Sequence, residues 1–171
     1  MDRWSARPIA YMKELGIMKG YPDGTFMPTK PITRAEFAQV IMKYINTPTK
    51  NNNMFKDLKG DYWATKAILM ATNEGWIKGY EDGTFRPERN ITRVETVTII
   101  NRMLKRALAD EDVSSIKVPV VDLDPNHWGY ADVLEAITRH DYTKNEDDKE
   151  NWSEYAYPFH EDMSKDAYNN V

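Results

Sequence analysis

The chain of 171 residues contains no cysteine. This absence excludes a disulfide framework, a zinc site built from thiolates and a cysteine nucleophile. No apolar run reaches the roughly 18 residues that a membrane-spanning helix needs. The first residues also lack the basic segment followed by an apolar stretch that marks a visible export signal. An extracellular location stays open, because a protein outside the cell does not require cysteine.

Basic residues are in short supply at one end of the chain. The formal net charge is -4, but residues 1–140 carry 20 basic and 18 acidic side chains, whereas residues 141–171 carry 3 and 9. A near-neutral body with an acidic end does not favour nucleic-acid binding, which needs a concentrated basic face. With 41% hydrophobic and 29% charged residues, the chain is in the range of ordinary globular proteins.

The sequence is built from a repeat. The run Gly20–Phe26 (GYPDGTF) returns as Gly79–Phe85 (GYEDGTF), and Ile32–Glu36 (ITRAE) returns as Ile91–Glu95 (ITRVE), both at an offset of 59 residues. A fixed period of this size indicates one supersecondary unit used several times, each copy packed on its neighbours. A third copy begins at Val120–Leu123 and His127–Trp128, but neither run is found after Tyr142.

Each repeat is expected to be a helix, a structured loop and a second helix. In the second copy residues 61–74 have one helical stripe of apolar residues and end at Gly75, which can close a helix in the left-handed conformation, as Gly16 does in the first copy. The Asp-Gly pair of each loop predicts a turn with a positive backbone dihedral. The second helices begin with the capping-box pattern Thr-Arg-x-Glu. Their expected apolar stripes are Phe37, Val40, Ile41 and Tyr44 in the first copy, and Val94, Val97, Ile100 and Leu104 in the second.

The arginines of these boxes need a further explanation. Arg34 and Arg93 lie in the first helical turn, where the helix dipole disfavours a cation. Two such residues in register suggest a site for a carboxylate or a phosphate. A salt bridge to Asp57 or Asp122 is the alternative.

Tryptophan recurs at the start of the first helix of each copy, as Trp4, Trp63 and Trp128. Core packing is the favoured role for these indoles, and stacking on a sugar ring is the alternative. Lys19 and Lys78, just before the loops, are either solvated or in contact with an anion. The loops have too few carboxylates for calcium, and the three histidines show no metal-ligand spacing, so we expect no metal and no cofactor.

Taken together, the run Phe-x-Asp-Leu, Trp, Gly-Tyr-x-Asp-Gly-Thr-Phe-x-Pro and Ile-Thr-Arg-x-Glu resembles the S-layer homology (SLH) domain family, over about residues 1–142. The resemblance implies a mostly α-helical fold of tandem helix-loop-helix repeats in a pseudo-threefold, trefoil-like arrangement. It also implies a noncatalytic module that binds an anionic secondary cell-wall polymer, often bearing a pyruvate ketal, at a bacterial surface. The polymer-binding role of the family's arginine maps onto Arg34 and Arg93. Groove-lining support is expected from Asp57, Trp63, Lys78, Asp122 and Trp128.

The expected repeat boundaries follow from the positions at which the sequence departs from the family pattern. Repeat 1 is residues 1–46 without its lead-in, repeat 2 is 54–106, a partial repeat 3 is 118–142, and an acidic tail with several aromatic residues is 143–171. The truncated third repeat leaves apolar surface uncovered, so we expect the tail, a second chain or another protein to cover it. For the tail, packing across the vacant third position is favoured over partner binding and disorder.

The alternative function is a structural subunit of a phage virion or of a surface layer that uses the same fold for assembly or host attachment. An enzyme is not expected, because the chain has no nucleophile elbow, phosphate loop or His-Glu-x-x-His helix.

Overall fold

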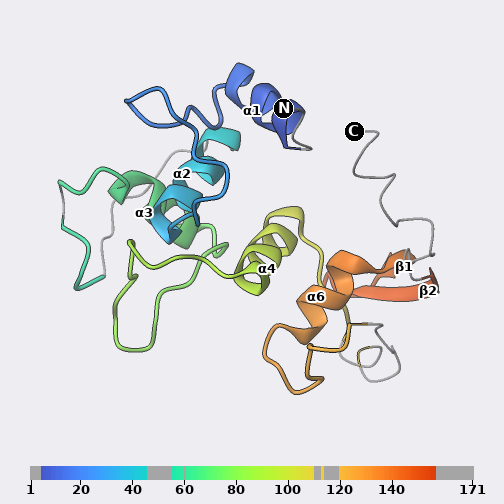
Figure 1. Cartoon of the computed structure of the whole chain (residues 1–171). Coiled ribbons are helices and arrows are strands. Elements are labelled where there is room, and N and C mark those ends of the chain that lie inside the picture. Colours follow the sequence, from blue (N-terminus) through green and yellow to red (C-terminus); the bar gives the residue numbers. More distant parts are fainter. Residues whose placement is uncertain (1–4, 46–54, 60, 110–112, 114–119, 157–171) are drawn as a thin grey trace. The chain divides into compact units, whose positions relative to one another are not determined.

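The computed structural model describes residues 5–45, 55–59, 61–109, 113 and 120–156, so Trp4 lies outside the described residues. The chain divides into two compact units, one within residues 1–91 and one within residues 92–164, and the division falls inside the second repeat. The described part is mostly helical, with five helices and one two-stranded sheet (Figure 1). The helices are α1 (Ala6–Glu14), α2 (Arg34–Tyr44), α3 (Thr65–Asn73), α4 (Arg93–Leu104) and α6 (Tyr130–Ile137), and the strands are β1 (Arg139–Lys144) and β2 (Glu150–Ala156). No helix in this part of the chain has the length and apolar character to span a membrane.

The first unit has its core at α3, which packs against α2 (Figure 1). All five residues from Ala67 to Ala71 are buried. The prediction of a single apolar stripe was therefore too narrow. Leu69 and Met70, outside that stripe, are also only 2% and 1% exposed. In contrast, α1 has no buried residue.

Trp63 is not part of this core, and the favoured packing role is wrong for it. Helix α3 begins at Thr65, two residues later than Trp63, so the indole lies on the preceding turn and is 56% exposed. Trp128 of the third repeat likewise precedes its helix and is 62% exposed. Both indoles are therefore more than half exposed to solvent.

The predicted helix signals are confirmed. Gly16 and Gly75 follow α1 and α3 with φ of 69° and 74°, a conformation that glycine adopts without strain. Helices α2 and α4 each begin with a complete capping box. In α2 the Thr33 hydroxyl accepts the Glu36 N–H at 3.1 Å, and the Glu36 carboxylate accepts the Thr33 N–H at 2.8 Å.

In the second unit α4 packs against α6 through polar groups. The Thr98 hydroxyl donates to Asp132 Oδ2 at 2.7 Å, and Asn101 Nδ2 donates to the Asp132 carbonyl oxygen at 2.9 Å. These bonds turn Thr98 and Asn101 inward, to 2% exposure each. The expected apolar stripe of α4 is therefore wrong at its C-terminal end, where Ile100 and Leu104 are 42% and 56% exposed.

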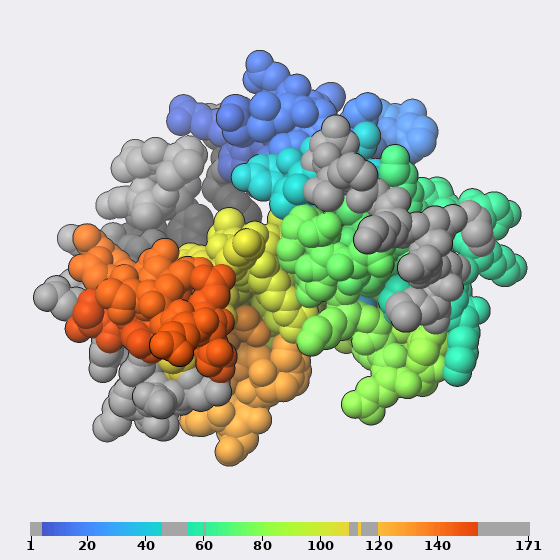
Figure 2. Space-filling model, turned by 180° about the vertical axis from the view of Figure 1, so that it is seen from behind, coloured from blue at the N-terminus to red at the C-terminus, as the bar shows by residue number. Residues whose placement is uncertain are grey.

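Strands β1 and β2 form an antiparallel hairpin. Strand β1 contains residue 142, where the sequence predicted the end of the third repeat. The hairpin makes a continuous area of surface, orange to red in Figure 2. Trp152 of the expected tail packs against the buried cluster of Leu108, Tyr130 and Leu134. Part of the expected tail is thus a component of the second unit's core, whereas Tyr157, Phe159 and Tyr168 lie outside the described residues.

Candidate functional site

The two glycine-rich loops have the same hydrogen bonds. In the second repeat the Tyr80 N–H donates to the Thr84 carbonyl at 2.8 Å, and the Gly83 N–H donates to the Tyr80 carbonyl at 2.9 Å. Asp82 Oδ1 accepts both the N–H and the hydroxyl of Thr84. The first repeat repeats all four bonds at Tyr21, Asp23, Gly24 and Thr25. The shared chemistry of the motif therefore builds one rigid turn in both copies.

Asp57 anchors the second loop to the lead-in segment. Its Oδ1 accepts the Phe85 N–H at 2.8 Å, and its Oδ2 accepts the Arg86 N–H at 2.7 Å. The Phe85 side chain is fully buried. The carboxylate and the aromatic ring thus fix the end of the loop from both sides.

Arg34 also binds this loop, from the start of α2. Its Nε donates to the Phe85 carbonyl at 3.0 Å, and its Nη2 donates to the Lys78 carbonyl at 2.8 Å. The guanidinium carbon lies 5.0 Å from the Tyr80 ring centre and 4.6 Å from the Phe85 ring centre. Arg34 is only 4% exposed, so its contacts join the second helix of one repeat to the loop of the next.

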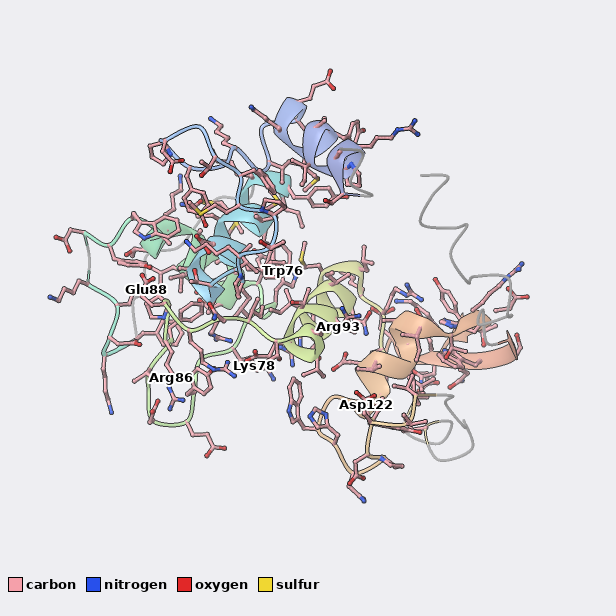
Figure 3. The ribbon with its side chains drawn as sticks, viewed as in Figure 1. Trp76, Lys78, Arg86, Glu88, Arg93 and Asp122 are labelled. Carbon is pink, nitrogen blue, oxygen red and sulfur yellow. The ribbon has the colours of Figure 1, made fainter. Side chains whose placement is uncertain are left out.

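The remaining candidates of the first unit are exposed. The Lys78 side chain is exposed, and the Lys78 carbonyl accepts a hydrogen bond from Arg34. The Trp63 carbonyl accepts a hydrogen bond from Gln39 Nε2 at 3.5 Å. Arg34, Asp57 and Lys78 therefore meet at one loop. Figure 3 shows Lys78 and Arg86 on the segments that enter and leave this loop.

Arg86 was missed by the sequence analysis. Its guanidinium pairs with Asp82 at 2.8 Å and lies 4.0 Å from the Tyr80 ring centre. Together with the hydrogen bonds from Thr84, this pair lowers the pKa of Asp82 to about 2. The first copy has Met27 at the same place, so the repeat comparison alone gave no signal for an arginine.

In the second unit, the candidates Arg93, Asp122 and Trp128 are exposed. Arg93 is the first residue of α4, and Asp122 lies on the segment that leads to α6 (Figure 3). Among the described residues the Arg93 guanidinium has no hydrogen bond or ion pair. The arginine at the positive end of α4 is thus available to an anion from outside.

The turn of the hairpin has hydrogen bonds like those of the two glycine-rich loops. The Asn145 N–H donates to the Lys149 carbonyl at 2.9 Å, the Asp148 N–H donates to the Asn145 carbonyl at 3.1 Å, and Asp148 has φ of 61°. These bonds match those of Tyr80, Gly83 and Thr84 at an offset of 65 residues, the offset that also relates Trp63 to Trp128. The sequence did not reveal this turn, because the glycine, threonine and phenylalanine of the motif are all replaced.

Comparison with known proteins places these features in a family. The family model of the S-layer homology domain matches residues 1–38 and 55–96. The chain is 40% identical over 155 residues to a cellulosome-anchoring protein of Acetivibrio thermocellus. The aligned region covers 87% of this chain and 34% of that protein. It is 32% identical over 128 residues to the S-layer protein EA1 of Bacillus anthracis, covering 74% of this chain and 14% of that protein.

A third relative carries an enzyme name. It is the exoglucanase XynX of Acetivibrio thermocellus, 36% identical over 103 residues, covering 59% of this chain and 9% of that protein. The chain thus spans about a third or less of these three relatives. Through the two matched segments, the chain belongs to the S-layer homology domain family.

Proposed function

We propose that the chain is a noncatalytic anchoring module at the bacterial cell surface that binds an anionic secondary cell-wall polymer. The observation that carries the proposal is the exposed Arg93 guanidinium at the N-terminus of α4, because a guanidinium at the positively polarised start of a helix suits a carboxylate or phosphate. A pyruvate ketal offers such a carboxylate. Two of the three relatives named above are an anchoring protein and an S-layer protein, which supports the same location.

The other candidate residues take different parts in this proposal. Lys78 supplies a second exposed cation, and the exposed indoles of Trp63 and Trp128 supply flat faces for sugar rings. Arg34 and Asp57 hold the loop in place through its backbone, and Asp122 is the exposed counterpart of Asp57 in the third repeat. The repeat boundaries and the trefoil arrangement remain part of the proposal.

The proposal also includes another protein or a second chain that covers the apolar surface left by the incomplete third repeat, where Trp128 and Tyr142 are 62% and 48% exposed. The relatives named above give no support to the virion alternative.

The experiment is retention of the purified chain by Gram-positive wall sacculi, with and without removal of the secondary polymer by hydrofluoric acid. Arg93→Ala should weaken retention about tenfold or more, the usual effect of losing one or two charge-assisted hydrogen bonds. Lys66→Ala, which removes an exposed cation from α3, is the matched control and should bind as the parent chain does. Equal retention of Arg93→Ala and the parent, or equal retention by stripped sacculi, would overturn the proposal.

A further inference from the structure

Two buried carboxylates stand in the second unit at positions that are apolar one repeat earlier. At the offset of 65 residues, Glu135 of α6 corresponds to Met70, and Glu150 of β2 corresponds to Phe85. All four residues are at most 1% exposed. Burial of a carboxylate is costly unless a cation or hydrogen-bond donors compensate its charge. The third repeat has therefore exchanged apolar core for a buried charged site.

His140 of β1 completes this site. Its Nε2 lies 3.3 Å from Glu135 Oε1 and 3.1 Å from Glu150 Oε2, and its side chain is 2% exposed. The three ligand atoms lie within 4.8 Å of one another, and a histidine with two carboxylates is a set that can hold a metal ion. The sequence gave no sign of this, since the three residues are separated by intervals of five and ten.

The tautomer of His140 follows from its second nitrogen. Nδ1 lies 2.8 Å from the Thr138 carbonyl oxygen, which can only accept, so Nδ1 carries a hydrogen. In a neutral ring, Nε2 would then direct its lone pair at two carboxylate oxygens. A hydrogen, carried by the ring or by one of the carboxyl groups, or a metal ion must therefore lie between Nε2 and these oxygens to hold the three groups together.

The remaining contacts satisfy the two carboxylates only in part. Arg106 Nη2 lies 2.6 Å from Glu135 Oε1, and Trp152 Nε1 donates to Glu135 Oε2 at 3.3 Å. The Arg106 guanidinium thus contacts Glu135, one of the two carboxylates. Within the described part of the chain, Glu150 Oε1 is buried without a hydrogen-bond partner, which is a second and independent sign of a missing ligand.

We propose that Glu135, His140 and Glu150 bind a divalent transition-metal ion, zinc in the first place, that ties α6 to the hairpin. A tetrahedral zinc site with bonds of about 2.0–2.1 Å separates its ligand atoms by about 3.3 Å. The two separations from His140 Nε2, 3.3 and 3.1 Å, fit that geometry, and all three ligand atoms lie within 4.8 Å of one another. The free Glu150 Oε1 can supply a further oxygen.

The nitrogen ligand and the outer hydrogen bonds favour a transition metal. Calcium and magnesium prefer oxygen ligands alone, whereas zinc accepts imidazole together with carboxylates. Bonds from Nδ1 of a ligating histidine to a carbonyl, and from a donor to a ligating carboxylate, are the usual second layer of such a site. His140 and Glu135 have both.

The test uses the full chain, freed of metal with EDTA, and measures zinc by competition with a chromophoric chelator and by elemental analysis after desalting. We expect one zinc ion per chain, and a higher melting temperature with zinc but not with magnesium. The double variant Glu135→Met, Glu150→Phe restores the residues of the second repeat and should fold without binding zinc. His127→Ala removes an exposed histidine of the same unit and should bind as the parent does.

The alternative, in which a proton rather than a metal ion lies at Nε2 of His140, is tested by a separate measurement. Nitrogen NMR of the His140 ring distinguishes an imidazolium from a ring with a metal at Nε2. An imidazolium signal that persists after zinc is added overturns the proposal. So does a parent chain that takes up no more zinc than the double variant.

Discussion

Arg34 and Arg93 occupy the same position in consecutive repeats, yet Arg34 is enclosed by the loop of the following repeat and Arg93 is exposed. The carbonyl of Phe85 accepts from Arg34 Nε, whereas the carbonyl of Glu150, at the equivalent position one repeat later, accepts the Ala109 N–H. One sequence pattern therefore yields a buried contact between repeats in one copy and an exposed cation in the other.

The two arginines should consequently differ in what they contribute to stability. Arg34→Ala removes two hydrogen bonds to loop carbonyls and should lower the free energy of unfolding by about 2–4 kcal/mol. Arg93→Ala should change it by less than about 0.5 kcal/mol, as is usual for exposed residues. Urea unfolding followed by circular dichroism measures both. Equal effects in the two variants would contradict the contrast between a buried contact and an exposed side chain.

The loops should lose stability in acid. The hydrogen bonds from Thr84 and the ion pair with Arg86 hold the pKa of Asp82 at about 2, below its ordinary value of 3.8. A carboxyl whose pKa is lowered by folding stabilises the fold above its unfolded pKa and loses that contribution as the pH falls through its folded pKa. The contribution of Asp82 should therefore be complete above about pH 4 and disappear toward pH 2.

Asp23 acts in the same direction, because hydrogen bonds from Thr25 lower its pKa as well. The melting temperature between pH 5 and pH 2 should thus fall less steeply in the double variant Asp23→Asn, Asp82→Asn than in the parent chain. Parallel curves for the two proteins would show that these carboxyls do not contribute.

Gly129 allows the close approach of α4 and α6. A Cβ atom at this position would overlap Cγ2 of Val94. Gly129→Ala should therefore destabilise the second unit by about 1–3 kcal/mol, the usual effect of overpacking. Val94→Ala in the same chain should restore part of the loss, and thermal unfolding of the single and double variants tests this. A double variant whose loss of stability exceeds the sum of the two single losses would contradict this prediction.

Asp132 connects α6 to two buried polar residues of α4. Asp132→Ala leaves the Thr98 hydroxyl without its acceptor and removes one of two acceptors of Asn101, so we expect a loss of about 1–3 kcal/mol. Asp124→Ala, which changes an exposed carboxylate before α6, is the control. Chemical unfolding that fails to distinguish the two variants would mean that the network contributes nothing.

The zinc proposal predicts that the hairpin is stabilised selectively. Hydrogen exchange should slow in β1 and β2 when zinc is added to the metal-free chain, because both strands carry ligands. The amides of α2 in the first unit serve as the internal control. A uniform change in both units, or none in the hairpin, would argue against a ligand at Glu135, His140 and Glu150.

The sequence alone determined the features that depend on neighbours along the chain. The capping boxes, the glycines that close α1 and α3, and the loop turns all rest on local hydrogen bonds and backbone dihedrals, which the motif residues dictate in any context. The repeat also sufficed to identify the family.

Only the tertiary structure decided which side chains are buried and with what they pair. Trp63 is exposed because α3 begins two residues beyond the indole. Leu104 is exposed and Thr98 is buried because the hydrogen bond to Asp132 turns a polar face of α4 toward α6. The buried cluster of Glu135, His140 and Glu150 likewise arises when the hairpin turns back on α6. The physical reason is the same in each case: burial and charge pairing depend on segments distant in the sequence, whereas capping and turns depend on residues only a few positions apart.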